Sequence, residues 1–266
     1  MTVRVAGVDL AAEAAGTALA VLRVEPGSVV LEQLHLGVDD ETIVRATRDV
    51  SLIGIDCAFG WPVDFVDFVA RHASAVERAD AGGGVQPAAP TLALPATGDL
   101  AWRRRLAHRE TDRVVTERTG ARPLSVATDR LGMTALRCAV LLDRLAGDGR
   151  VVDRSGEHPS AVVEVYPAMA LRVWQLGRPG YKQSTDARSA LIDALSSAAP
   201  WLELGEHRPL MQASADALDA VLAALVALAH ARGAGIRPTP DQLYKARVEG
   251  WISIPTVGLA ELGAIL

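Results

Sequence analysis

The sequence has few of the residues that mark several protein classes. Only two of its 266 residues are cysteine, and Cys57 and Cys138 form no CxxC motif, so reduced, buried thiols are expected. The six histidines show no HxxxH or HxH spacing, which argues against a zinc site. No apolar run reaches the roughly 18–20 residues that a membrane-spanning helix needs, and the N-terminus lacks the features of a secretion signal. We therefore expect a cytoplasmic protein without a membrane partner.

Lysine is also scarce. Of the 27 basic residues only Lys182 and Lys245 are lysine, and the formal net charge is −5. This balance argues against a broad basic surface that coats nucleic acid, although it leaves room for an enzyme with a local basic face. With 50% hydrophobic and 22% charged residues, the composition is that of an ordinary globular protein.

What is present is an ordered series of strand and helix patterns. Three apolar stretches, 3–9, 17–24 and 28–36, predict an antiparallel meander, and a helical pattern then leads to a fourth strand at 51–56. Glycine and proline interrupt the pattern at 80–99, which predicts a loop, a lid or a surface insertion. The later predictions are helices at 100–120, 129–146, 185–199 and 214–233, a fifth strand at 160–167, and a strand or hairpin arm at 249–255.

Two of the predicted strands end in an acid. Asp9 is the last residue of the first strand, and Asp56 closes the fourth, in "LIGID". A crossover that contains a helix joins these strands, so they should be parallel and end at the same edge of a sheet. A charge at the end of a buried strand is costly unless it is offset, and it can cap a turn or bind a metal. A fifth parallel strand would bring Glu164 towards the same rim.

Two more acids interrupt the start of the apolar helix at 214–233. Asp216 and Asp219 are three residues apart and share a face of that helix. An acid in the first turn after a Ser214 cap can simply complement the helix dipole, an explanation that suits Asp216 better than the deeper Asp219. Carboxylates that converge repel one another, whereas Mg²⁺ or Mn²⁺ would offset that repulsion and could activate a phosphodiester.

Three arginines follow one another at helical spacing. Arg105, Arg109 and Arg113 fall at i, i+4 and i+8 of the predicted helix, with Asp112 beside them. Guanidinium groups bind phosphate in bidentate fashion, so this row is a candidate for substrate binding. A solvated helix face with internal ion pairs explains the same spacing.

Six segments together carry a family resemblance. They are "GVDLA" (7–11), "GIDCAFGWP" (54–62), "RETDR" (109–113), "EVYPAMALR" (164–172), "DALDAVLAAL" (216–225) and "EGWISIP" (249–255). Because the six segments occur in this order, the chain resembles an uncharacterised family, number 429 among the domains of unknown function, described as predicted nucleases of RNase H fold. The resemblance implies one RNase H-like α/β domain over 1–266. It would have a mixed five-stranded sheet, three strands antiparallel and two parallel, flanked by helices, with a loop and helical insertion at about 80–150.

The resemblance also implies roles for the acids. The RNase H-like superfamily carries acids on strand one, strand four and the last helix, which Asp9, Asp56 and the pair Asp216/Asp219 match. The paired helix acids are similar to those of Holliday-junction resolvases. Glu164 is a further candidate ligand.

Three functions are consistent with these patterns. The first is a phosphodiester hydrolase that uses Mg²⁺ or Mn²⁺ and acts on nucleic acid or a smaller phosphoester. The second is an ATP-dependent phosphotransferase of the actin-like branch, which shares the fold, although a second phosphate loop and an adenosine-binding glycine pair are not found. The third is a non-catalytic binding module in which the acids cap turns and pair with arginines.

Overall fold

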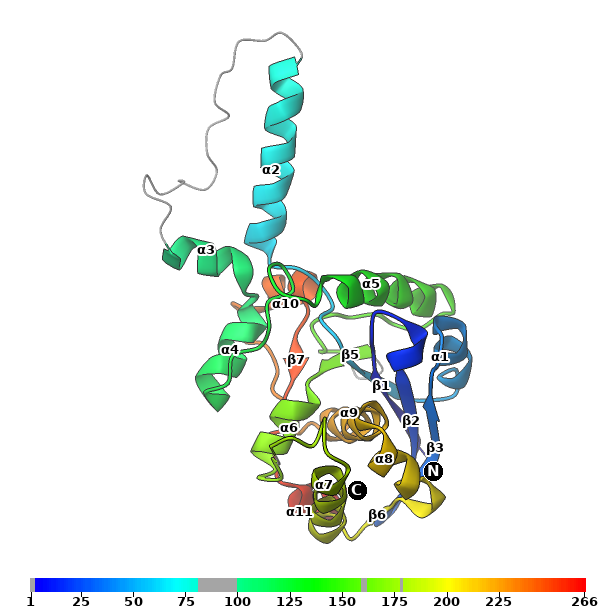
Figure 1. Cartoon of the computed structure of the whole chain (residues 1–266). Helices are drawn as coiled ribbons and strands as arrows, with labels where there is room; N and C mark the ends of the chain where they lie inside the picture. Colours follow the sequence, from blue (N-terminus) through cyan, green and yellow to red (C-terminus); the bar gives the residue numbers. More distant parts are fainter. Residues whose placement is uncertain (1–2, 81–99, 159–161, 178) are drawn as a thin grey trace.

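The fold is built around a mixed β-sheet with helices on both faces (Figure 1). The computed structural model describes residues 3–80, 100–158, 162–177 and 179–266, so the interruption expected at 80–99 lies, apart from Asp80, outside the described residues. In the described part the sheet has seven strands in the order β6-β3-β2-β1-β4-β5-β7. The α/β class is confirmed. The expected count of five strands is wrong, because the two-residue strands β6 (Leu202–Glu203) and β7 (Ile252–Ser253) extend the two edges.

The predicted meander and crossover are both present. Strands β1 (Val3–Asp9), β2 (Ala18–Glu25) and β3 (Ser28–Leu36) pair antiparallel. Helix α1 (Asp40–Ala46) then leads to β4 (Leu52–Asp56), which pairs parallel with β1. The Asp39 side chain begins α1 by accepting the Thr42 N–H at 2.8 Å. Beyond β4, strand β5 (Val162–Val165) continues the parallel part of the sheet, and β7 pairs parallel with β5.

Side-chain alternation divides each central strand between two cores. Ala6 and Val8 of β1 pack in one cluster with side chains of α1 and α5 (Gly132–Gly147). Val5 belongs to the other cluster, which contains α9 (Ala215–Ala231). Because successive side chains of a strand point to opposite faces, Asp9 shares the parity of Val5 and points to the face that α9 covers. The same alternation places Asp56 on that face.

Helix α9 lies unusually close to the sheet. Its residues from Ala217 to His230 are all buried, and the helix packs across β1, β2 and β4. A Cβ on Gly7 would lie 2.1 Å from the backbone nitrogen of Ala224, and one on Gly54 would lie 2.8 Å from the carbonyl oxygen of Ala223. Glycine is therefore required at both strand positions, because helix backbone and strand backbone are in contact.

The region expected to be one helix at 100–120 contains two. Helix α3 (Leu100–Ala107) ends before α4 (Glu110–Thr119), and Gly120 follows α4 as its C-cap, as predicted. The break occurs because the Asp112 carboxylate accepts the backbone N–H of Arg109 at 2.9 Å and begins a new helix. The prediction of one continuous helix is wrong.

The remaining helices surround this framework. Figure 1 shows α2 (Val63–Asp80) standing away from the sheet, with α3 near its base, where Phe68 and Trp102 meet edge to face at 5.6 Å. None of the helices in the described ranges is both long enough and apolar enough to cross a membrane. The other helices are α6 (Pro167–Val173), α7 (Thr185–Ala198), α8 (Arg208–Ala213), α10 (Leu243–Glu249) and α11 (Leu259–Ala264).

Candidate functional site

The ends of two parallel strands place two carboxylates side by side. Asp9 and Asp56 are register partners in the pairing of β1 with β4, and neighbouring strands lie about 4.8 Å apart. Both side chains point to the face that α9 covers, as the alternation of the two strands requires. The prediction that these acids share one rim of the sheet is confirmed.

Helix α9 brings a third carboxylate to this rim. Asp219 is only 1% exposed, and its helix turn precedes the residues that contact Gly7 and Gly54. The Tyr181 hydroxyl donates to Oδ1 of Asp219 at 2.9 Å, and the Lys182 ammonium lies 2.8 Å from Oδ2. The close approach of α9 to the two strands therefore carries Asp219 to the site.

Asp9, Asp56 and Asp219 together are called the acid cluster, and Asp216 lies at its edge. It is partly exposed in the first turn of α9, after a Ser214 side chain that accepts the Ala217 N–H at 3.2 Å. Both the cap and the acidic first turn that sequence reasoning considered are thus present. The charge of Asp216 still reaches the cluster, because it adds to the rise in the pKa of Asp9 and of Asp219.

The three converging carboxylates have a shortage of positive charge. Burial, followed by repulsion from Asp56 and Asp219, raises the pKa of Asp9 to about 9. Burial and the charge of Asp219 raise the pKa of Asp56 to about 8. Burial also raises the pKa of Asp219, although Lys182 and Tyr181 act in the opposite direction. The Lys182 ammonium lowers the pKa of all three acids, but the net shifts remain upward.

The carboxylates of Asp9, Asp56 and Asp219 are chemically suited to a hard divalent cation. Carboxylate oxygens are the ligands that Mg²⁺ and Mn²⁺ prefer, and here they come from two strands and a buried helix. Within the ranges that the structure describes, however, no group of three or more His, Cys, Asp and Glu side chains is already arranged to hold a metal ion. One oxygen of Asp219 is instead occupied by the Lys182 ammonium.

Glu164 belongs to a different cluster. Its Oε1 accepts from Nη2 of Arg109 at 2.8 Å and its Oε2 from Nη1 at 2.9 Å, while the Phe59 N–H donates to Oε2 at 3.1 Å. The charge of Glu164 reaches Asp56 and raises its pKa, yet both oxygens are already bonded. Because its carboxylate is the buried counter-ion of Arg109, we leave Glu164 out of the candidate metal ligands, in contrast to the sequence interpretation.

Arg109 is buried rather than part of an exposed row. Its side chain is 4% exposed and pairs with Asp112 and Glu164, and Nη1 also donates to the Glu249 carbonyl at 3.0 Å. These bonds use the guanidinium inside the protein, so it does not offer a surface for phosphate. The sequence interpretation of Arg109 as a substrate-binding residue is not retained.

The other two arginines of the expected row lie on separate helices. Arg105 is on α3 and pairs with Asp64 of α2 at 3.6 Å. Arg113 is on α4 and pairs with Glu110 at 2.7 Å, and it donates to the His108 carbonyl at 2.8 Å. The break at 108–109 divides the row between two helices. An ion pair within one helix, the alternative expectation, is found for Arg113, whereas Arg105 pairs with a different helix.

Two residues of the acid cluster escaped the sequence analysis. Tyr181 and Lys182 lie in the segment between α6 and α7, 38 and 37 positions before Asp219, and no periodic pattern links them to it. One signal was available, because Lys182 is one of only two lysines in the chain.

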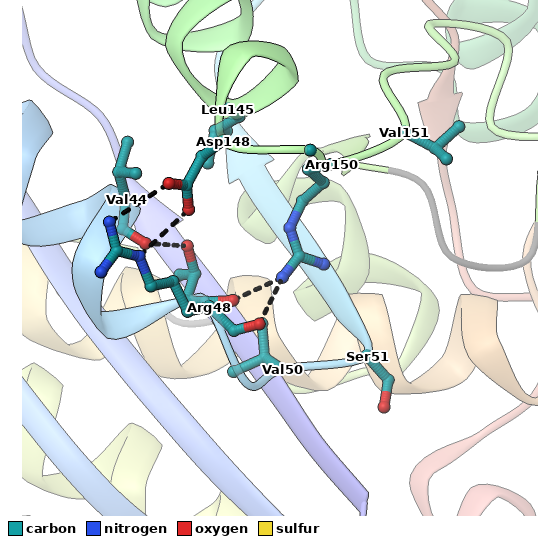
Figure 2. Close-up of a pocket in the computed structure, with 10 residues that line it drawn as sticks. Val44, Arg48, Val50, Ser51, Leu145, Asp148, Arg150 and Val151 are labelled. Carbon is teal, nitrogen blue, oxygen red and sulfur yellow. Dashed lines mark hydrogen bonds and ion pairs between the residues drawn. The ribbon is translucent and has the colours of Figure 1, made fainter.

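A hollow of about 610 Å³ lies at the start of β4, the end of the strand away from Asp56 (Figure 2). Val50 and Ser51, which precede the strand, form part of its wall. Arg48 pairs with Asp148 at 3.2 Å, and Arg150 donates to the Thr47 carbonyl. Because its arginines are bonded to the protein's own groups, this hollow is a weaker candidate than the acid cluster.

The comparisons with known proteins identify a family for the chain and give no activity for it. No curated protein and no solved structure matches the chain. The model of one family, described as "Protein of unknown function (DUF429)", matches residues 7–243. That range contains Asp9, Asp56, Asp216 and Asp219 together with Tyr181 and Lys182. The match covers most of the chain, which therefore belongs to the DUF429 family.

Proposed function

We propose that this protein is a divalent-metal-dependent phosphodiester hydrolase with an RNase H-like fold, acting on nucleic acid or on a smaller phosphoester. One observation carries the proposal. Asp9 and Asp56 are register partners at the ends of neighbouring parallel strands, and the buried Asp219 of α9 acts electrostatically on both. Rigid elements thus direct three carboxylates to one place, where a cation would offset their repulsion.

The chemistry would use Asp9, Asp56 and Asp219 as ligands for Mg²⁺ or Mn²⁺. When bound, the metal would supply positive charge to the phosphate oxygens as a bond to phosphorus breaks. Hydrolysis adds one water to phosphorus and breaks one bridging P–O bond, giving a phosphomonoester and an alcohol. A carboxylate of the cluster can accept the proton that the water loses, and the departing oxygen takes up a proton to become the alcohol.

A binding measurement with a matched control tests the metal site. Mn²⁺ should bind wild type in calorimetry, and Asp9→Asn should weaken that binding by about tenfold or more, because an anionic ligand is lost. Asp193→Asn is the control, since Asp193 is 68% exposed and pairs with Arg208 on the surface. It should bind Mn²⁺ as wild type does.

The activity test uses two phosphodiesters. With Mn²⁺ present, wild type should hydrolyse bis(4-nitrophenyl) phosphate or a short single-stranded oligonucleotide. Asp9→Asn should lower kcat/KM by about a hundredfold or more, because the charge stabilisation by a metal is worth several kcal/mol. Absence of Mn²⁺ binding and of hydrolysis would refute the proposal and favour a binding module. If ATP instead protects the protein against unfolding, a phosphotransferase is favoured.

A further inference from the structure

The acid cluster contains a built-in cation. Lys182 extends from the segment between α6 and α7, and its Nζ lies 2.8 Å from Oδ2 of Asp219. Its charge also lowers the pKa of Asp9 and of Asp56, so the ammonium acts electrostatically on all three acids. Tyr181, the preceding residue, donates its hydroxyl to the other oxygen of Asp219 at 2.9 Å. Two successive side chains therefore engage the two oxygens of one buried carboxylate.

The backbone that carries Lys182 is held firmly. Arg188 of α7 is 6% exposed, and its Nη1 donates to the Tyr181 carbonyl at 3.0 Å and to the Lys182 carbonyl at 3.3 Å. Its Nε donates to the Gln212 carbonyl at 2.8 Å, which ties this segment to α8. The Lys182 side chain is by contrast 52% exposed. The four-carbon side chain of Lys182 thus extends from a fixed backbone beside the acids.

The chemical identity of this cation is informative. Lysine is rare in the chain, and the other one, Lys245, pairs with Glu110 at 3.3 Å away from the acid cluster. An ammonium is a compact point charge, whereas a guanidinium forms a planar, bidentate pair that would hold the carboxylate in one arrangement. An ammonium can therefore leave one oxygen of Asp219 and contact another oxygen nearby.

We propose that Lys182 takes the cation position at Asp219 when no metal is bound, and that metal binding releases it to contact a non-bridging oxygen of the substrate's phosphate. This inference rests on the proposed hydrolase function and adds a substrate-binding residue to it. A divalent cation would attract the Asp219 carboxylate more strongly than the ammonium does, and it would repel the ammonium beside it. The fixed backbone then keeps the released ammonium over the same rim, where the phosphate would lie.

Two substitutions separate this role from a structural one. Lys182→Met removes the charge but keeps a long apolar side chain, and Lys245→Met is the matched control. Lys182→Met should bind Mn²⁺ about tenfold more tightly than wild type, because the competing cation is gone. The same variant should hydrolyse bis(4-nitrophenyl) phosphate with a kcat/KM about tenfold lower, since the phosphate contact is lost. Lys245→Met should change neither quantity.

Opposite changes in the two quantities identify the dual role. Unchanged or weaker Mn²⁺ binding by Lys182→Met would overturn the competition, and unchanged kcat/KM would overturn the phosphate contact. If wild type binds Mn²⁺ and is active while Lys182→Met equals it in both respects, the inference fails and the hydrolase proposal stands. If only Lys182→Met binds Mn²⁺ and neither protein is active, the hydrolase proposal fails and the competition stands. Absence of Mn²⁺ binding by both proteins overturns both.

A measurement on wild type avoids dependence on the variant's folding. Reductive methylation followed by peptide mass spectrometry compares the two lysines of the chain directly. Mn²⁺ should accelerate methylation of Lys182, because its amine is no longer held against Asp219, and leave Lys245 unchanged. Adding a non-hydrolysable phosphorothioate diester should slow it again. Equal methylation of Lys182 with and without Mn²⁺ would overturn the proposed release.

Discussion

Replacing Arg109 with methionine should destabilise the protein strongly. Its guanidinium pairs with Asp112 at 2.9 Å and with Glu164 at 2.8 Å, and both carboxylates are nearly fully buried. Methionine cannot replace these bonds, so two buried acids would lose their counter-ion. Breaking a buried pair in this way costs on the order of 3–5 kcal/mol, which corresponds to a fall in Tm of roughly 10 °C for a domain of this size.

Urea unfolding of matched arginine variants measures this cost. Arg105→Met removes an exposed arginine that pairs with Asp64 at 3.6 Å, and it should change the free energy of unfolding by only about 0–1 kcal/mol. The loss in Arg109→Met should be smaller at pH 5 than at pH 8, because burial already raises the pKa of Glu164 and the orphaned acid then takes up a proton. Adding Glu164→Gln should restore part of the stability. Equal losses for the two arginine variants would refute the reasoning.

Two further predictions concern the strands beneath α9. Burial and neighbouring acids raise the pKa of Asp9 from 3.8 to about 9, so metal-free wild type should lose stability as the pH rises between these values. The gain in urea stability from Asp9→Asn should therefore be larger at pH 9 than at pH 5, and an equal gain at both would contradict the raised pKa. Gly7→Ala should cost about 1–3 kcal/mol or more, because its Cβ would meet the backbone of α9. In the same denaturation assay Gly132→Ala, whose Cβ would have nothing within 4 Å, should not be destabilised.

The position of Asp9 and Asp56 at one edge of the sheet could be predicted because short-range sequence patterns determine it. Strand alternation, the crossover and the position of each acid at a strand end required only short segments of sequence. The same patterns placed Asp219 on a buried helix. The stretch 249–255, predicted as a strand or hairpin arm, contains β7, although its place in the sheet is not predicted. The patterns give no sign of β6, since a strand of two residues is too short to show alternation.

The sequence predicts one row of arginines because the helical spacing of Arg105, Arg109 and Arg113 continues across the break between α3 and α4. Residues 100–120 have no proline or glycine before Gly120, so periodicity alone suggests one helix. The break depends on Asp112, whose carboxylate caps the new helix and pairs with Arg109. Tyr181 and Lys182 could not be placed either, because only the tertiary fold brings their segment to Asp219.

The contact of α9 with Gly7 and Gly54 has a consequence for how the family can diversify. Backbone atoms set the separation between helix and strands there, so drift of core side chains cannot retune the spacing of the three acids. Asp9, Asp56 and Asp219 should therefore keep a constant spacing while core side chains change.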